Sequence, residues 1–589
     1  MASLDSNPKS IQSLYGWYNE DLLWVNRRYQ RKLVWTLLEK QKLIESVVQK
    51  YPIPALLLAD REGEEEGYEL IDGLQRLHTF VSFIEGAFPT LDGRYFDVSQ
   101  FPTANTRAGT GRFALQKDVE LISARDVNTF LDYTMAISIM RGATDAEIDE
   151  VFARINTYGH RLSDQERRQA GVQAEFPRLV RDLACDLRGD VSVEILGLSE
   201  MPSISIDLPK TKHGYSVDAS EVFWVEQGIL RSTDLRDSMD EQCIADIAAS
   251  IVGGGLIDRS KDALDEVYET GSAENQRISD ALSSYGADRF SAEFKHVVDE
   301  IRLVSSAGQS EKLRDLLFQK RTTNPFQALF AVLFIAFHEL LIGEDWKIAD
   351  YVAVHNALAN LNKRVDTSRG STSADERRAN ISTIQGLIRP HLVPGTHDDI
   401  YGDHTVTDID AMIRRSRIEV AHYELKQGML RLDKTHSLDP RMPSKIARTL
   451  AAIANNGKER SGTLLIGVAD DDGDAARVQA LYGILPRAVG SKKVVGVNRE
   501  AKALNESVED YVSRIKNAIR SADLSEPLKG AVLASVTYSD YFGLGVVVIR
   551  VPPQADVSLL DGKVYVRQVD ETVEATTASA LLEVGKRFR

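Results

Sequence analysis

The sequence predicts an α+β protein of several domains, and three observations lead to that prediction. The chain has 589 residues, whereas one domain usually has about 150. Apolar residues make up 43% of it, which is ordinary for globular domains with sizeable cores. Short apolar strands separated by turn residues occur before residue 90 and after residue 415, while residues 165–390 show mainly helical periodicity.

We therefore expect four segments: a compact α/β unit within residues 1–110, a mainly helical domain at 111–390, a linker at 391–412, and a second α/β domain at 413–589. The histidines and aspartates of 391–404 match no standard metal-site spacing, so a polar linker is preferred there. Residues 326–342 are nearly all apolar but fall short of the roughly 20 that a membrane span needs. We expect a buried helix at 326–342 and a polar loop at 365–380.

The charge and the cysteines limit the class of protein. With 87 acidic and 71 basic residues the net charge is -16, which excludes a protein that coats nucleic acid by overall charge. Any nucleic-acid contact requires a local basic patch or a metal. Cys185 and Cys243 provide no disulfide framework, and the first residues lack a signal-peptide pattern, so a cytoplasmic location without a membrane is expected.

Residues 68–80 predict a strand, a sharp turn and a helix in direct succession. Asp72-Gly73 is a strong turn signal, with Asp72 the expected helix N-cap. Gln75 and Arg76 then fall in the first helical turn, where free N–H groups and a guanidinium suit a phosphate. The alternative is an ordinary strand-turn-helix in which Arg76 is only a solvated charge.

Three stretches resemble the N-terminal domain of GmrSD-type restriction proteins, which belongs to the ParB/sulfiredoxin-like superfamily. Residues 71–77, Ile-Asp-Gly-Leu-Gln-Arg-Leu, resemble its IDGQQRL signature, with Leu74 in place of one of the two Gln residues that are commoner there. Gln30-Arg31 followed by Trp35 resembles its QR…W motif, and residues 152–168 resemble F.RIN..G..L...E.R. SspE-type phage-defence proteins carry a related domain.

This resemblance implies that the three stretches surround one pocket that binds or hydrolyses a nucleoside triphosphate. Asp72 would hold a metal or orient water there. Arg154 and Asn156 either face the same pocket or brace an interdomain turn. The implied phosphate-binding residues in the first two stretches are Gln30, Arg31, Gln75 and Arg76. The chain has no GxxxxGK[ST] sequence, so any nucleotide site is not a Walker A site.

The last 170 or so residues have a different pattern. Helices are expected at 444–455 and 508–519, and strands at 462–469, 532–536, 545–551 and 563–567. Asp561-Gly562 predicts a tight hairpin turn. This order resembles the Schlafen-type AlbA domain, with 451–456 and 462–471 carrying most of the likeness. An inserted Lys-Glu-Arg-Ser after Asn456-Gly457, and Val569 in place of a glycine, depart from the family pattern.

In Schlafen relatives two glutamates and an aspartate form an RNase centre, and the matching positions here are Glu419, Glu424 and Asp470, with Asp471 as an alternative. Three such carboxylates converging on Mg²⁺ or Mn²⁺ would activate water. Because Glu419 and Glu424 are five residues apart, the site requires a bend between them. Glu424 and Lys426 could instead belong to a nuclease of the PD-(D/E)xK kind.

The resulting expectation is a bacterial defence protein whose N-terminal domain binds a triphosphate or the backbone of modified DNA and controls a C-terminal metal-dependent nuclease. Defence follows from the resemblance alone. A non-catalytic, nucleotide-gated nucleic-acid-binding protein is the alternative, and an N-terminal nuclease is a third, weaker one. The expected partners are DNA or RNA and a nucleoside triphosphate, and a homo-oligomer stays open.

Overall fold

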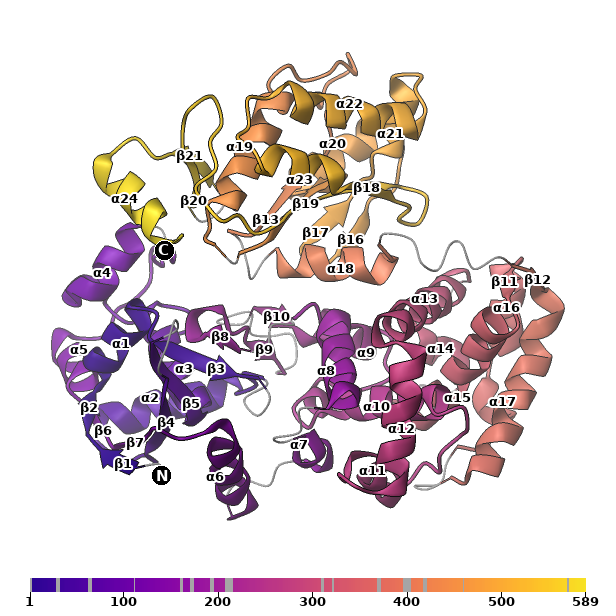
Figure 1. Ribbon diagram of the computed structural model, residues 1–589, viewed down its shortest axis with the longest axis horizontal. Coiled ribbons are helices and arrows are strands. Elements are labelled where there is room, and N and C mark those ends of the chain that lie inside the picture. Colours follow the sequence, from indigo (N-terminus) through magenta and orange to yellow (C-terminus); the bar gives the residue numbers. More distant parts are fainter. Residues whose placement is uncertain are drawn as a thin grey trace. The chain divides into compact units, whose positions relative to one another are not determined.

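The computed structural model divides the chain into two compact units, 1–109 with 113–401, and 110–112 with 402–589. Side chains at 145, 149, 153 and 156–158 are outside the description. Both units mix helices and small sheets (Figure 1), which confirms the α+β multidomain prediction. The structure describes residues 3–27, 32–61, 66–110, 112–158, 163–169, 174–190, 195–206, 216–308, 312–319, 322–367, 372–395, 404–416, 421–458, 460–568 and 571–588.

A six-stranded sheet organises the first part of the chain. Its order is β1 (Ser3–Ser6), β7 (Ile137–Arg141), β4 (Leu56–Arg61), β5 (Gly67–Asp72), β3 (Leu23–Asn26) and β8 (Ile195–Gly197). The pairs β4/β7 and β3/β5 are parallel, and the other pairs are antiparallel. The sheet thus takes two strands from beyond residue 110.

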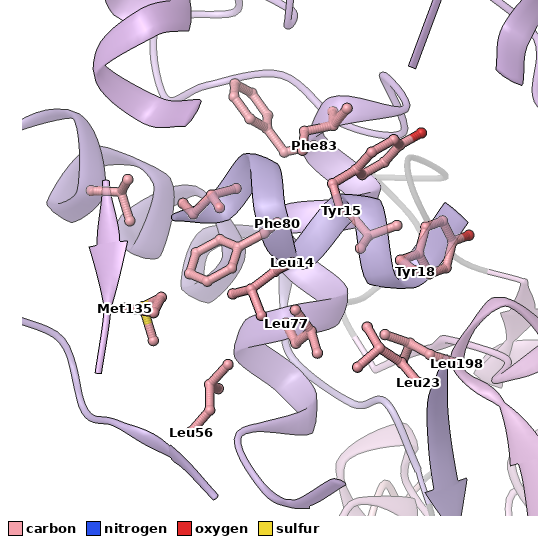
Figure 2. Close-up of a cluster of buried hydrophobic side chains, with 14 of the residues drawn as sticks. Leu14, Tyr15, Tyr18, Leu23, Leu56, Leu77, Phe80, Phe83, Met135 and Leu198 are labelled. Carbon is pink, nitrogen blue, oxygen red and sulfur yellow. The ribbon is translucent and has the colours of Figure 1, made fainter. Parts of the chain in front are cut away.

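Helices α1 (Ile11–Asn19), α2 (Leu37–Val48), α3 (Leu74–Ile84) and α5 (Ala124–Leu131) contribute to a single apolar core with this sheet. Figure 2 shows Leu77, Phe80 and Phe83 of α3 gathered with Leu14 and Tyr15 of α1. The sequence predicts a helix at 37–49 and strands at 55–59 and 68–71, and the structure confirms each to within two residues. Burial of each large apolar side chain in this core stabilises the fold by about 1.5–3 kcal/mol. The packing of α3 in the core holds the first turn of this helix in place.

The sequence also predicts a strand at 134–140 and a capping box at residues 144–147, and these two predictions have different outcomes. The strand expected at 134–140 is divided into β6 (Thr134–Met135) and β7, because β6 pairs with β2 (Lys9–Ser10) and not with the large sheet. The expected capping box of α6 (Asp145–Tyr158) is present: Thr144 N–H donates to Glu147 at 2.9 Å, and Glu147 N–H donates to Thr144 Oγ1 at 3.3 Å.

Residues 174–391 are mainly helical, as predicted. The longer helices are α8 (Glu175–Arg188), α10 (Met239–Val252), α12 (Ala273–Tyr285), α13 (Ala287–Ser306), α15 (Gln327–His338) and α17 (Ala374–Ile388). The apolar α15 is buried as expected, and no helix among the described residues is long and apolar enough to cross a membrane.

The polar loop predicted at 365–380 is wrong in its second half, where α17 begins. Ser373 and Glu376 form a capping box there. Arg377 is buried and makes an ion pair with Asp246 of α10 at 2.8 Å. A polar sequence forms a helix here because its charged residues find caps and a buried partner.

Glu300 of α13 gives a pH-dependent prediction. Desolvation raises the pKa of Glu300 to about 7, although Tyr351 donates hydrogen bonds to it at 3.0 and 3.2 Å. Because the folded-state pKa exceeds the unfolded one, this group's contribution to stability is present below pH 4.5 and is lost as pH rises through 7. When the pH rises from 5 to 8, the unfolding free energy of Glu300→Gln should therefore decrease by roughly 1–3 kcal/mol less than that of wild type. Urea unfolding at the two pH values measures this difference. Equal decreases in the two proteins would contradict the raised pKa of Glu300.

The second unit contains a four-stranded sheet in the order β13 (Tyr423–Lys426), β14 (Gly462–Ile466), β19 (Val546–Val551) and β18 (Val536–Ser539). A three-stranded sheet orders β15 (Val468–Ala469), β17 (Lys492–Val494) and β16 (Arg487–Val489). A hairpin joins β20 (Tyr565–Gln568) to β21 (Glu571–Glu574). The helices are α18 (Val406–Arg415), α19 (Met442–Ala454), α20 (Asp472–Tyr482), α21 (Asn498–Ala503), α22 (Val508–Ser521), α23 (Leu528–Ala534) and α24 (Ala578–Lys586).

Most sequence predictions in this unit are confirmed, with two corrections. The tight turn at Asp561-Gly562 has both φ angles positive, 51° and 72°, as a two-residue hairpin turn requires. The strand expected at 532–536 is wrong, because Leu528 and Val532 are buried one helical turn apart in α23. The second half of the expected linker is also helical, since α18 begins at Val406.

Candidate functional site

The N-terminal candidate site is built where β5 ends and α3 begins. Gly73 has φ 100°, a conformation that favours glycine. A Cβ there would lie 2.2 Å from Leu56 Cδ2, so the close packing of β4 also requires glycine. Gly73, not Asp72, is the N-cap of α3, and it makes no side-chain cap, which corrects the expected role of Asp72.

Arg76 and Asp72 form an ion pair across this turn. Arg76 Nη2 donates to Asp72 Oδ2 at 2.9 Å and to the carbonyl of Ala55 at 3.0 Å. Arg76 Nε is buried and has no hydrogen-bond partner among the described residues. The Asp72 side chain is 44% exposed, whereas the Arg76 side chain is 14% exposed. A carboxylate open to solvent therefore stands beside a guanidinium with unused donor capacity and the uncapped start of α3.

Gln75 binds the protein's own backbone. Its Nε2 donates to the carbonyl of Lys32 at 2.7 Å, and its Oε1 accepts from the N–H groups of Val34 and Trp35 at 3.2 and 3.3 Å. Three hydrogen bonds use most of the capacity of one amide. The side chain thus fastens residues 32–35, which follow the Gln30-Arg31 motif, to the first turn of α3.

The other predicted residues of this pocket are placed differently. Gln30 and Arg31 lie outside the described residues, and so does the side chain of Asn156. Arg154 is 74% exposed and makes an ion pair with Glu150 at 2.5 Å. Among the described residues, the structure brings together Asp72, Gln75 and Arg76 at the β5–α3 junction.

The third motif ends at a polar pocket next to α7 (Asp164–Gln169). Arg168 lines this pocket together with residues of α10 and α11 (Lys261–Tyr268). Its guanidinium donates to Asp265 at 2.7 Å, to Gln165 and Gln242 at 3.3 Å, and to the carbonyl of Lys261 at 3.2 Å. Arg168 therefore braces the junction with the helical region, while the two roles expected for Arg154 and Asn156 stay predictions.

A buried charge network, not foreseen from the sequence, flanks the Gln30-Arg31 motif on both sides. Arg27 pairs with Asp190 at 2.5 Å. Lys32 Nζ donates to the Leu235 carbonyl and to Ser238 Oγ, both at 2.8 Å, and lies 3.5 Å from Glu241. Burial of such charges requires partners. The one feature of the sequence that could have indicated the network is that Arg27 and Lys32 stand on either side of the motif. Among the described residues, the network contains Arg27, Lys32, Arg188, Asp190, Asp240 and Glu241, all buried.

The C-terminal candidate site centres on Glu424 of β13. Arg567 of β20 approaches Glu424 Oε2 at 2.7 Å, and Lys426 donates to Glu424 Oε1. The Arg567 side chain is 2% exposed and the Glu424 side chain 14%. The Glu-x-Lys pair and the arginine of the Val-Tyr-Val-Arg stretch, 141 residues later in sequence, therefore meet at one point.

Asn455 and Asn456, at the end of α19, hold this arrangement in place. The buried Asn455 side chain donates to the carbonyls of Ser558 and Tyr565 at 3.0 and 2.8 Å and accepts from Ser558 N–H at 2.8 Å. Asn456 donates to the carbonyl of Ala421 at 2.7 Å. The two amides thus position the segments that carry Arg567 and Glu424.

The other proposed nuclease carboxylates do not join Glu424 in the described structure. Asp470 pairs with Lys492, whose ammonium also contacts the Asp470 carbonyl at 3.0 Å. Asp471 caps α20 by accepting from Asp474 N–H at 2.8 Å. Glu419 lies outside the described residues. Within the described parts of the chain, no three His, Cys, Asp or Glu side chains form a group that could hold a metal ion.

Comparison with protein families separates the chain into two recognised parts. Residues 14–172 match the model of the GmrSD restriction endonuclease N-terminal domain. Residues 419–576 match the Schlafen AlbA_2 model. This chain joins a GmrSD-type N-terminal domain to a Schlafen AlbA_2 domain. No curated protein and no solved structure matches the chain.

The two matched regions contain the two candidate sites. The GmrSD-type domain includes the β5–α3 junction and Arg168, and therefore extends beyond the α/β unit expected within 1–110. The AlbA_2 domain includes Glu424, Asp470 and Arg567. The residues of the helical region, including Asp190, Asp240 and Glu241, lie between the two matches.

Proposed function

We propose that this chain is a bacterial defence protein of the restriction type. The observation that carries the proposal is the presence of a GmrSD-type domain and a Schlafen AlbA_2 domain in one chain. The GmrSD-type domain would bind a nucleoside triphosphate or the backbone of modified DNA, and the AlbA_2 domain would act on DNA or RNA. The helical region between them would transmit the ligand state.

The distribution of charge supports this division of roles. Residues 402–589 contain 27 Lys and Arg and 25 Asp and Glu, which gives a net charge of +2. Because the whole chain has a net charge of -16, residues 1–401 have a net charge of -18. A polyanion is therefore repelled by the first unit as a whole and is tolerated by the second. In the first unit, an anion needs a local cationic site, which the 14% exposed side chain of Arg76 at the uncapped start of α3 would supply.

A nucleoside triphosphate binds together with Mg²⁺ or Mn²⁺. The two candidate sites differ in whether their side chains are suited to bind such a metal ion. Asp72 is an exposed oxygen ligand next to Arg76, which suits a metal bound to phosphate. At the second site the described carboxylates do not form a metal-binding group. The effector role that we propose for this domain is nuclease action through Glu419, Glu424 and Asp470.

Cleavage assays test the effector role. Glu424→Gln removes the charge that orients Lys426 and Arg567 but keeps the side chain's shape. Cleavage of DNA or RNA with added Mg²⁺ or Mn²⁺ should fall about 10- to 100-fold. Glu506→Gln, which breaks a comparable ion pair with Arg514, is the matched control. Cleavage unaffected by Glu424→Gln would rule out this centre, and loss with Asp72→Ala instead would move the nuclease to the first domain.

The pairing of Glu424 favours a second candidate function. A carboxylate already neutralised by Arg567 at 2.7 Å and by Lys426 is suited to a structural role. The AlbA_2 domain would then be a nucleic-acid-binding module under nucleotide control. Binding of nucleic acid without cleavage under any metal or triphosphate would support this alternative.

A further inference from the structure

The exposed side of α19 carries only basic and small residues. Its solvent-facing positions are Ser444, Lys445 and Arg448, and the exposed Arg441 immediately precedes the helix. Positions 441, 445 and 448 are spaced by four and three residues, so their side chains lie on one helical face. At about 1.5 Å per residue they cover roughly 10 Å. The opposite side of α19 is buried in the main core of the second unit.

Further cations extend this face beyond the helix. Lys458 is exposed just after α19 ends. Lys563 is exposed beside the Asp561-Gly562 turn, and Arg448 is close enough to act on its charge. The Arg448 guanidinium also stacks over the ring of Tyr565 in β20, with 5.7 Å from Cζ to the ring centroid. Figure 1 shows β20 beside α19. The α19 basic face is defined here as Arg441, Lys445, Arg448, Lys458 and Lys563.

Carboxylates neutralise only part of the α19 basic face. Arg441 pairs with Asp439 at 3.1 Å and Lys563 with Glu574 at 2.9 Å. Lys445, Arg448 and Lys458 make no ion pair with any carboxylate that the structure describes. Three unpaired cations on a rigid helix and the loop that follows it form a local positive patch in a chain whose net charge is -16.

We propose that the α19 basic face binds the phosphate backbone of a nucleic acid. This proposal rests on the nucleic-acid role of the AlbA_2 domain proposed above and places the contact on one surface of it. Lysine and arginine side chains that contact phosphates fix position without reading sequence. The binding is therefore independent of base sequence and depends on salt.

Fluorescence anisotropy with labelled duplex DNA and single-stranded RNA, at 50 to 200 mM KCl, tests the proposal on the full chain. Lys445→Gln/Arg448→Gln removes two of the unpaired cations. Lys502→Gln/Arg520→Gln removes the same charge from exposed positions on α21 and α22 of the same unit, so it controls for the loss of charge itself. Lys445→Gln/Lys458→Gln leaves the Arg448–Tyr565 contact intact and serves if the first variant unfolds.

For duplex DNA, the slope of log affinity against log salt should become shallower by about 2 in the Lys445/Arg448 variant. Wild type should then lose about tenfold more affinity than this variant between 50 and 200 mM salt. The control should keep the wild-type slope. Equal slopes in the two double variants would overturn the α19 basic face while leaving the proposed function intact. No binding by wild type would overturn the nucleic-acid role itself, and tighter binding to anionic lipid vesicles than to DNA or RNA would reassign the surface.

Discussion

Replacing Arg188 with methionine should destabilise the first unit by about 3–5 kcal/mol, because it leaves buried carboxylates without their cation. Arg188 Nη1 donates to Asp240 at 2.6 Å and lies 3.3 Å from Glu241, and all three side chains are at most 1% exposed. Without Arg188, Asp240 and Glu241 lose the hydrogen bonds that its guanidinium donates to them. Urea unfolding followed by tryptophan fluorescence measures the loss.

The matched control is Arg231→Met, since Arg231 is 57% exposed and pairs with Asp234 at 2.8 Å. An exposed pair of this kind contributes about 0–1 kcal/mol. If Arg188→Met cost no more than the control, the network would not be the structural anchor of the residues around the Gln30-Arg31 motif.

Replacing Arg76 with alanine should weaken triphosphate binding about 10- to 100-fold, because a hydrogen bond to a charged group contributes about 1.5–3 kcal/mol. Arg76→Lys keeps the charge but loses the planar fork, so we expect an intermediate loss. Calorimetry with Mg²⁺-triphosphates gives the dissociation constants. Arg94→Ala, at an exposed ion pair with Asp92 in the same unit, should bind like wild type. An affinity unchanged by Arg76→Ala would remove Arg76 from the site.

Local sequence patterns predict the helices and strands that carry the candidate sites. They do not predict the tertiary packing and side-chain pairing that decide between alternative structures for the same segment. The Asp72-Gly73 turn and the placement of Gln75 and Arg76 in the first turn of α3 follow from residue types alone. The N-cap of α3 is Gly73 and not Asp72, whose carboxylate accepts a hydrogen bond from Arg76 instead. The β-branched Val532 and Val536 favour a strand at 532–536. Burial of Leu528 and Val532 one helical turn apart instead places Val532 in α23.

Long-range pairing was the part of the candidate sites that the sequence did not reveal. Gln75 is a residue type that can bind phosphate, yet its side-chain amide makes hydrogen bonds to the backbone of residues 32–35. Glu424 is a residue type that often binds metal, yet its carboxylate pairs with Arg567, which is 143 residues later in the sequence. Neither partner has a fixed spacing that a motif could encode.

The central claim is that the ligand state of the GmrSD-type domain controls what the AlbA_2 domain does to nucleic acid. The most direct test measures nucleic-acid binding and cleavage by the full chain against a panel of triphosphates, with unmodified and modified DNA, for wild type and Arg76→Ala. Our account predicts that at least one triphosphate or modified DNA changes the wild-type response and that Arg76→Ala abolishes this change. A response identical with and without every ligand of the panel would contradict it.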